Sequence, residues 1–360
     1  MTKVGFLGAP KIKIDGYEII DLDLTQYFQK TTTIKDLLLG GINSYYYSNR
    51  ILFAGYIDEM YRNKDSEYQR FEKDFIETFQ DVDILIVGHF LQIHPETIQK
   101  HFKNTIKIMA FIDEPNSTYI RGIPYLWAYD AALYISPSYS ESELMRSALH
   151  KWGCKNSYWM PLSLVEPPEF PAETNDDFFT NRHTDMVYIG KHYGDKINRL
   201  VELKKTFGKD FEIYGRYPFK GYGAMLRGLF GLPHLTQRVQ SLSDLERKEK
   251  YFDSKISFNM HLSDKRECGN LRTYEAPMHG CMLMSNTAGE NAHNLIFKSG
   301  IEAVYYENMD DAVEKIKYYL EHDSERIKIA KAGFKKVLQD YNPRKILSEM
   351  LLWASTVEKG

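Results

Sequence analysis

Strand-sized apolar runs alternate with amphipathic stretches through the first part of the chain. Four runs predict buried strands, at residues 3–9, 83–90, 106–113 and 131–138. Residues 66–81 predict a helix, because their apolar side chains repeat at helical spacing and form one stripe: Tyr68, Phe71, Phe75, Ile76 and Phe79. Residues 95–104 and 140–153 also predict helices, the second with Ser140 as its N-cap and Gly153 as its stop. This alternation is typical of a doubly wound parallel α/β sheet.

The alternation then stops and restarts. Residues 161–186 carry four prolines and many polar side chains without a clear period, which predicts a connection between two domains. Further strands are expected at residues 185–190, 211–215, 255–262, 281–285 and 301–308, and helices at 195–208, 310–322 and 324–341. We therefore expect a first domain over residues 1–165, a linker over 166–185, a second domain over 186–342 and a terminal helix over 343–360.

Composition narrows the class of protein. The chain has 360 residues, enough for two ordinary cores, and its net charge of -3 gives no global attraction to nucleic acid or to a membrane surface. The three cysteines fit neither a zinc pattern nor a disulfide framework, and the histidines form no spaced metal-ligand cluster. No signal peptide and no transmembrane run is visible, so we expect a cytoplasmic protein.

Ligands of open α/β sheets bind beyond the carboxyl ends of the strands, and two such domains form a cleft. The residues that follow predicted strands are therefore the first candidates for a site. In the first half they are Gly8, His89, Asp113 and Glu114. In the second half they are Gly190, Lys191, Gly215, Arg216, residues 263–272, Ser285 and Asn286.

One of these segments, ECGNLRTYE over residues 267–275, has a helix-start pattern. A short helix is expected from Leu271, closed by Gly280, although Pro277 removes one of its backbone hydrogen bonds. The free N–H groups at its start suit phosphate oxygens. Arg272 either adds charge there or pairs with Glu275 at i, i+3. A carboxylate binds a pair of hydroxyls well, yet spacing alone favours the plainer interpretation of two surface glutamates on a solvated face.

The pattern E-x7-E, followed by A-x-x-x-G and an apolar strand, resembles the signature of retaining GT-B glycosyltransferases. Residues 250–360 are similar in order and spacing to the carboxy-terminal domain of the CgeB-like, spore-maturation type glycosyltransferases. A weaker likeness reaches back to residues 186–200. The resemblance implies a GT-B architecture, in which two doubly wound Rossmann-like domains face each other across a cleft and the terminal helix packs back on the first domain.

The resemblance also implies roles for individual residues. Glu275 would bind the ribose of the nucleotide, Glu267 the donor sugar, and the backbone at Gly269, Asn270 and Leu271 the diphosphate. Lys191, Lys196 and Arg199 are the candidates for the basic pair on the diphosphate, and the familiar Gly-Arg is Gly-Lys here. The base would lie near Gly215 and Arg216, His89 near the donor sugar or acceptor, and Asp113 near the acceptor. His89 also suits a packed strand end, and Asp113 and Glu114 a plain turn before proline.

The expected function is glycosyl transfer, hexosyl or pentosyl, from a nucleotide-diphosphate sugar, with a UDP-sugar as the expected donor. Retention, metal independence and the absence of a further cofactor are implied by the resemblance. The alternatives are a nucleotide-sugar epimerase of the same architecture and a non-catalytic nucleotide-sugar-binding protein. The acceptor stays open among glycan, lipid-linked, protein and modified nucleic-acid molecules; the basic, aromatic residues 216–250 are the segment that would suit an anionic one.

Overall fold

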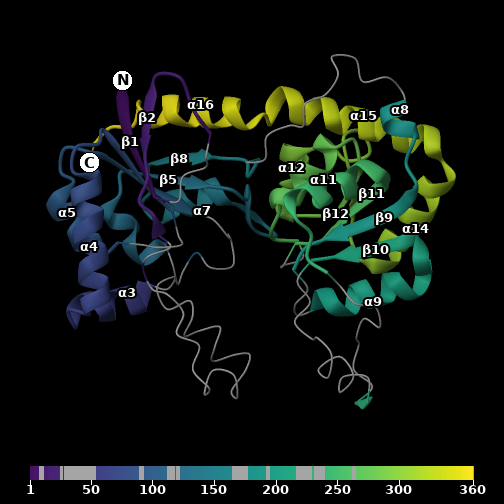
Figure 1. The fold of residues 1–360 in the computed structure, drawn as a ribbon, viewed down its shortest axis with the longest axis horizontal. Coiled ribbons are helices and arrows are strands. Elements are labelled where there is room, and N and C mark those ends of the chain that lie inside the picture. Colours follow the sequence, from purple (N-terminus) through teal and green to yellow (C-terminus); the bar gives the residue numbers. More distant parts are fainter. Residues whose placement is uncertain are drawn as a thin grey trace. The chain divides into compact units, whose positions relative to one another are not determined.

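The computed structural model places the chain in two compact units. The residues it describes are 1–7, 12–24, 27, 54–88, 93–111, 118, 122–163, 177–191, 195–215, 229–230, 240–261 and 265–359. Unit 1 comprises Met1–Tyr139, Glu143–Pro161 and Arg344–Gly360, and unit 2 comprises Ser140–Ser142 and Leu162–Pro343. Each unit has its own sheet and its own hydrophobic core (Figure 1).

The sheet of unit 1 is parallel and has the strand order β2-β1-β3-β4-β5-β8. Its strands are β1 (Thr2–Leu7), β2 (Tyr17–Ile20), β3 (Ile84–Gly88), β4 (Ile106–Phe111), β5 (Ala131–Tyr134) and β8 (Asn156–Trp159). The central strands β3, β4 and β5 are buried along their whole length, which explains their continuous apolar sequence. In register, Val4 pairs with Ile84 and Ile108 with Ala131.

Helices surround this sheet. They are α3 (Ala54–Arg62), α4 (Ser66–Phe79), α5 (Pro95–His101), the 3-10 helix η3 (Ile123–Ala128), α7 (Met145–Lys151) and α16 (Pro343–Ala354). The predicted stripe of α4 is confirmed, because its four aromatic positions 68, 71, 75 and 79 are buried in the core. Asp65 caps this helix by accepting from the N–H groups of Glu67 and Tyr68.

The predicted start of the helix over 140–153 is wrong. Ser140 belongs to a short strand, β6 (Ser138–Ser140), which pairs with β7 (Glu143–Leu144). The helix α7 starts only at Met145, whose N–H donates to the carbonyl of Pro137 at 2.9 Å. The small hairpin therefore takes the residues that the capping pattern had assigned to the first helical turn.

The sheet of unit 2 is also parallel, with the order β10-β9-β11-β12-β13. Its strands are β9 (Thr184–Ile189), β10 (Phe211–Tyr214), β11 (Ser254–Asn259), β12 (Met282–Asn286) and β13 (Val304–Tyr306). Its helices are α8 (Asp177–Thr180), α9 (Asp195–Phe207), η4 (Gly208–Asp210), α11 (Asp244–Asp253), α12 (Leu271–Met278), η5 (Gly289–Asn291), α13 (His293–Ile296), α14 (Met309–Glu321) and α15 (Asp323–Asp340). None of the helices in the described ranges is both long and apolar enough to cross a membrane.

The end of the segment predicted as a linker folds into unit 2. The helix α8 lies there, and Arg182 is buried directly after it. The guanidinium of Arg182 donates to the carbonyls of Tyr251 and Ser254 at 2.8 and 2.7 Å, and to that of His279 at 2.8 Å. Arg182 thereby ties the ends of α11 and α12 together. The rest of the segment, residues 164–176, lies outside the described residues.

Candidate functional site

Two glycines meet where β9 and β10 end. The N–H of Gly190 donates to the carbonyl of Tyr214 at 3.0 Å. Gly215 has φ +118°, and a Cβ on it would lie 1.9 Å from the carbonyl oxygen of Gly190. A Cβ on Gly190 would in turn lie 2.5 Å from a terminal nitrogen of Arg272. Gly215 requires glycine, because its Cβ would strike backbone, whereas at Gly190 the close neighbour is the end of a flexible side chain.

Two cationic side chains converge on the carbonyl of Met260, just beyond β11. Arg272 donates to it through Nη2 at 3.2 Å, and Lys196 through Nζ at 3.0 Å. Lys196 is buried, with 7% of its surface exposed, and the guanidinium of Arg272 lies 5.5 Å from the ring centroid of Tyr188. Arg272 thus does not form the predicted alternative pair with Glu275; its Nε donates to Asn259 Oδ1 at 2.9 Å.

Asn259 is the hydrogen-bonding centre of this edge, and sequence reasoning missed it. Its side-chain amide pairs in both directions with that of Asn270, at 3.2 and 3.1 Å. Its Nδ2 also lies 3.3 Å from both Thr273 Oγ1 and Ser285 Oγ. The signal in the sequence was a polar residue closing an apolar strand, KISFN, which a fully buried position accepts only with its hydrogen bonds satisfied.

The start of α12 lies beside this centre. Asn270 is its N-cap, and its side chain accepts from the N–H of Thr273 at 3.2 Å. The N–H of Asn270 points at His261 Nε2, at 3.4 Å. In the described part of the chain, the N–H groups of Leu271 and Arg272 have no acceptor. Together with Gly269, whose φ is +84°, they form a helix start that an anion can approach.

His261 supports that helix start as a neutral ring. Its Nδ1 lies 3.1 Å from Asn286 Oδ1, which leaves Nε2 to accept from Asn270. Burial lowers the pKa of His261 to about 3, and the charges of Lys196 and Arg272 act in the same direction. The contacts of His261 therefore give it a positioning role.

Glu275 lies one turn into α12, as the helix prediction required, and is almost fully buried. Its Oε1 accepts from Arg247 Nε of α11 at 2.6 Å, and Arg247 also bonds Asp244 at 2.9 Å. Burial raises the pKa of Glu275, and Arg247 opposes that rise. Nothing in the sequence singled out Arg247, which lies 28 positions away along the chain.

The other predicted site residues are placed as follows. Lys191 is exposed just after β9, and its carbonyl accepts from Tyr188 OH at 3.2 Å. Arg199 donates to Asp195 at 2.7 Å along α9. Glu267 is half-buried in the segment before α12. Gly8, His89, Asp113, Glu114 and Arg216 lie outside the described residues.

The described part of the basic segment 216–250 is largely α11, and two of its cations face carboxylates. Arg247 pairs with Glu275 and Asp244, and Lys250 pairs with Glu212 at 2.9 Å. These two residues therefore do not offer free positive charge to an anionic partner. Across the described ranges, no group of three or more His, Cys, Asp or Glu side chains could hold a metal ion.

The buried histidines make the stability of unit 2 depend on pH. Burial lowers the pKa of His261 to about 3 and that of His279 to about 4, from 6.5. As the pH falls below 6.5, the unfolded chain therefore takes up protons that the folded chain refuses. We expect the free energy of unfolding to fall toward pH 5 by up to about 1.4 kcal/mol per pH unit for each histidine. Glu275, with its raised pKa, acts in the opposite direction.

Urea unfolding at a series of pH values measures this slope. The ring of His279 interacts through Nδ1 with the carbonyl of Glu275 at 2.7 Å. His279→Asn keeps a donor at that place and removes one titrating group, so its slope should be smaller than that of the wild type. An unchanged slope in this variant would contradict the assignment.

The comparisons with known proteins agree with this geometry. Residues 196–351 match the family model described as glycosyl transferase-like. HepE from Anabaena, solved with UDP and glucose, is 9% identical and aligns over 99% of this chain and 100% of its own, with a TM-score of 0.58. The chain has the GT-B fold. The α/β GT-B architecture expected from the sequence is confirmed.

Two further GT-B structures are similar in fold. An alpha-glucosyltransferase in complex with UDP and a 13-mer DNA containing an HMU base is 11% identical, over 79% of this chain and 83% of its own, with a TM-score of 0.53. TarM is 15% identical over 76% of this chain with a TM-score of 0.53, and this chain spans 55% of the length of TarM. A search of curated protein sequences finds no match.

Proposed function

We propose that the protein is a glycosyltransferase that moves a hexosyl or pentosyl group from a nucleotide-diphosphate sugar, with a UDP-sugar as donor. The observation that carries this proposal is the convergence of Arg272 and Lys196 beside the open start of α12, with the buried carboxylate of Glu275 one turn further along. The UDP bound in HepE and in the DNA-bound alpha-glucosyltransferase supports UDP as the nucleotide part of the donor.

The charge of the leaving UDP explains why these cations and backbone N–H groups suit the reaction. When the glycosidic bond of the donor breaks, negative charge develops on the UDP diphosphate. Fixed cations and helix N–H groups stabilise such charge without reorganising, and they do so most strongly where water is excluded. In this proposal the N–H groups of Leu271 and Arg272, with the side chains of Arg272 and Lys196, receive the diphosphate. Metal independence and the lack of a further cofactor belong to the proposal.

The other candidate residues are assigned to the remaining parts of the same donor. Glu275 accepts the ribose hydroxyls, Glu267 contacts the hydroxyls of the donor sugar, and Gly215 lies beside the base, as the resemblance implies. Lys191 remains a candidate for the diphosphate, whereas Arg199 is already paired with Asp195. Transfer with retention and a cytoplasmic location are further parts of the proposal. His89, Asp113 and Arg216 keep their sequence-based roles as predictions.

Thermal unfolding with nucleotides tests the donor. A ligand that binds only the folded state raises Tm, so UDP and UDP-sugars should raise it, and UMP, which lacks the second phosphate, should raise it less. EDTA should leave the UDP shift unchanged. If no nucleoside diphosphate or nucleotide sugar raises Tm, the proposal fails.

Product analysis separates the three functional classes. A transferase forms UDP and a glycosylated acceptor, which mass spectrometry detects as a mass increase of one sugar residue. An epimerase instead forms an isomeric UDP-sugar without releasing UDP, and a binding protein leaves the donor unchanged.

A further inference from the structure

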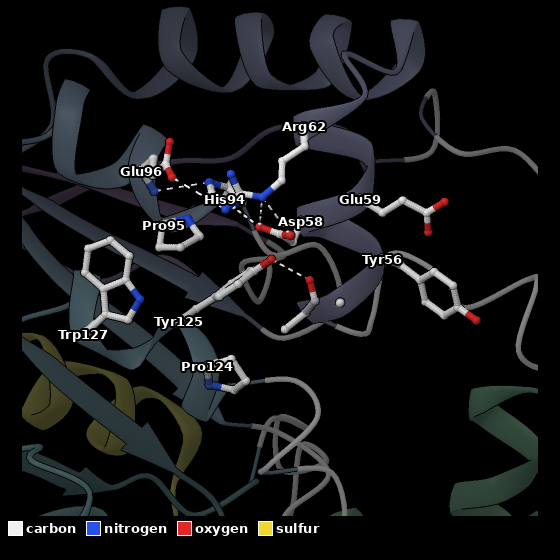
Figure 2. A pocket seen from close by; sticks show the side chains of 12 residues that line it. Tyr56, Asp58, Glu59, Arg62, His94, Pro95, Glu96, Pro124, Tyr125 and Trp127 are labelled. Carbon is white, nitrogen blue, oxygen red and sulfur yellow. Dashed lines mark hydrogen bonds and ion pairs between the residues drawn. The ribbon is translucent and has the colours of Figure 1, made fainter.

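Unit 1 contains a cavity that none of the candidate site residues described above lines. It has a volume of about 930 Å³ and is lined by α3, the start of α5 and η3 (Figure 2). The helix α5 begins at Pro95, a few residues after β3 ends at Gly88. The cavity therefore lies on the carboxyl side of the sheet of unit 1, where open α/β sheets bind their ligands.

His94 holds one wall of this cavity rigid. Its ring stacks on Tyr61, with the centroids 3.8 Å apart and an angle of 4° between the planes. Its Nδ1 accepts from the N–H of Glu96 at 3.3 Å, which leaves Nε2 to donate to Asp58 Oδ1 at 3.1 Å. Both ring nitrogens are thus engaged, and the N–H of His94 bonds Tyr68 OH at 2.8 Å. His94 therefore positions the wall and does not act as a base.

Among the described residues that line the cavity, negative charge predominates. Three carboxylates, those of Asp58, Glu59 and Glu96, accompany one guanidinium, that of Arg62. Arg62 Nε lies 2.9 and 3.0 Å from the two oxygens of Asp58, and this hydrogen bond is the main cause of the lowered pKa of Asp58. The single cation of this described lining is therefore already paired. A phosphate-bearing ligand would be repelled here, whereas hydroxyl and amino groups would find acceptors.

Aromatic surface completes the lining. The indole of Trp127 is 61% exposed, although large apolar side chains usually gain from burial. Figure 2 shows it beside Pro95, on the opposite side of Asp58 from Tyr56 and Glu59. Tyr125 is fixed through its OH, which donates to the carbonyl of Ala54 at 2.6 Å. A flat ring next to hydrogen-bond acceptors suits a ligand with one apolar face and a rim of hydroxyls.

We propose that this cavity binds a sugar without negative charge, neutral or amino-substituted, and that this sugar is the acceptor of the transferase. The second half of this statement rests on the function proposed above. The first half rests only on the cavity, its paired cation, its carboxylates and its exposed indole. The inference favours a glycan over DNA or a phosphate polymer as the acceptor.

A glycan array probed with the labelled full-length protein tests this inference. The array carries neutral, amino, sulfated and phosphorylated glycans, together with single-stranded oligonucleotides. We expect binding to a subset of the neutral or amino glycans. Trp127→Ala should weaken that binding by about tenfold, and Trp127→Phe, which keeps a ring, should weaken it less. Leu352→Ala is the matched control, because Leu352 is 65% exposed on α16 of the same unit.

The outcomes separate this inference from the proposed donor site. Binding only to anionic probes, binding to none, or equal binding by the wild type and Trp127→Ala would each overturn it. If UDP raises Tm while no uncharged glycan binds, the donor proposal stands and the sugar cavity falls. If glycans bind through Trp127 while UDP does not bind, the cavity stands and the transferase proposal falls. An unchanged Tm of Trp127→Ala shows that its fold is intact.

Discussion

Replacing Glu275 with glutamine is expected to weaken UDP binding by roughly 10- to 100-fold, because hydrogen bonds to a charged group contribute about 1.5–3 kcal/mol. The variant keeps the shape of the side chain but removes its charge and replaces one acceptor oxygen by an NH2 donor. The carboxylate lies 5% exposed on α12, so water cannot replace the lost acceptor. In the proposed mechanism, kcat/KM for the UDP-sugar falls by a similar factor. Titration calorimetry with UDP measures the binding, and release of UDP from the donor measures the rate.

Asp244→Asn is the matched control for this variant. Asp244 bonds the same guanidinium, that of Arg247, but its side chain is 87% exposed. An exposed ion pair contributes little, so UDP binding should change by no more than about twofold. Equal losses in Glu275→Gln and Asp244→Asn would mean that the salt bridge as a whole matters, and that Glu275 is not the ribose acceptor.

The variant Arg247→Gln tests whether Arg247 keeps the carboxylate of Glu275 ionised. Without Arg247, burial alone acts on Glu275, and its pKa rises further. UDP binding by this variant should therefore strengthen as the pH is raised, since more of Glu275 then carries its charge. A flat pH profile would contradict this role for Arg247.

Gly215→Ala is expected to destabilise unit 2 by roughly 3–5 kcal/mol, as strongly as a severe core substitution. The new Cβ would lie 1.9 Å from the carbonyl oxygen of Gly190, and a backbone atom cannot rotate away as a flexible side chain can. The φ of +118° adds strain, because residues with a Cβ avoid this region. Urea unfolding measures the loss.

Gly208→Ala provides the comparison. Gly208 also has a positive φ, +56°, but a Cβ there meets nothing within 4 Å. The loss of stability in Gly208→Ala should come from the left-handed backbone conformation alone and amount to about 1–2 kcal/mol. If both variants lose the same stability, the close approach of Gly215 and Gly190 is not what constrains this edge.

Local patterns in the sequence predicted the five strands of the sheet of unit 2 and the strands β1, β3, β4 and β5 of unit 1, but not β2 or β8. The stripe of α4 repeats every three to four residues, and all of its partners belong to one core, so periodicity alone identified it. The start of α12 carries its own N-cap, Asn270, within the motif itself. By contrast, the start of α7 is decided by the pairing of β6 with β7, which a helical capping pattern does not contain.

The partners of the candidate site could not be read from the sequence. Glu275 meets Arg247 from another helix, and Arg272 meets Lys196 through the carbonyl of Met260. These contacts exist only because parallel strands bring their carboxyl ends to one edge. The sequence likewise does not distinguish Trp127 from a core aromatic, whereas its 61% exposure beside a cavity does.

The return of α16 to unit 1 has a consequence for how the chain is synthesised. Trp353 of this helix stacks on Tyr158 of β8, with the ring centroids 5.0 Å apart, and Lys359 bonds the carbonyl of Asn104. A ribosome makes the bulk of unit 1 first but supplies α16 only after all of unit 2. Unit 2 can therefore complete its core while unit 1 still exposes the surface that α16 will cover.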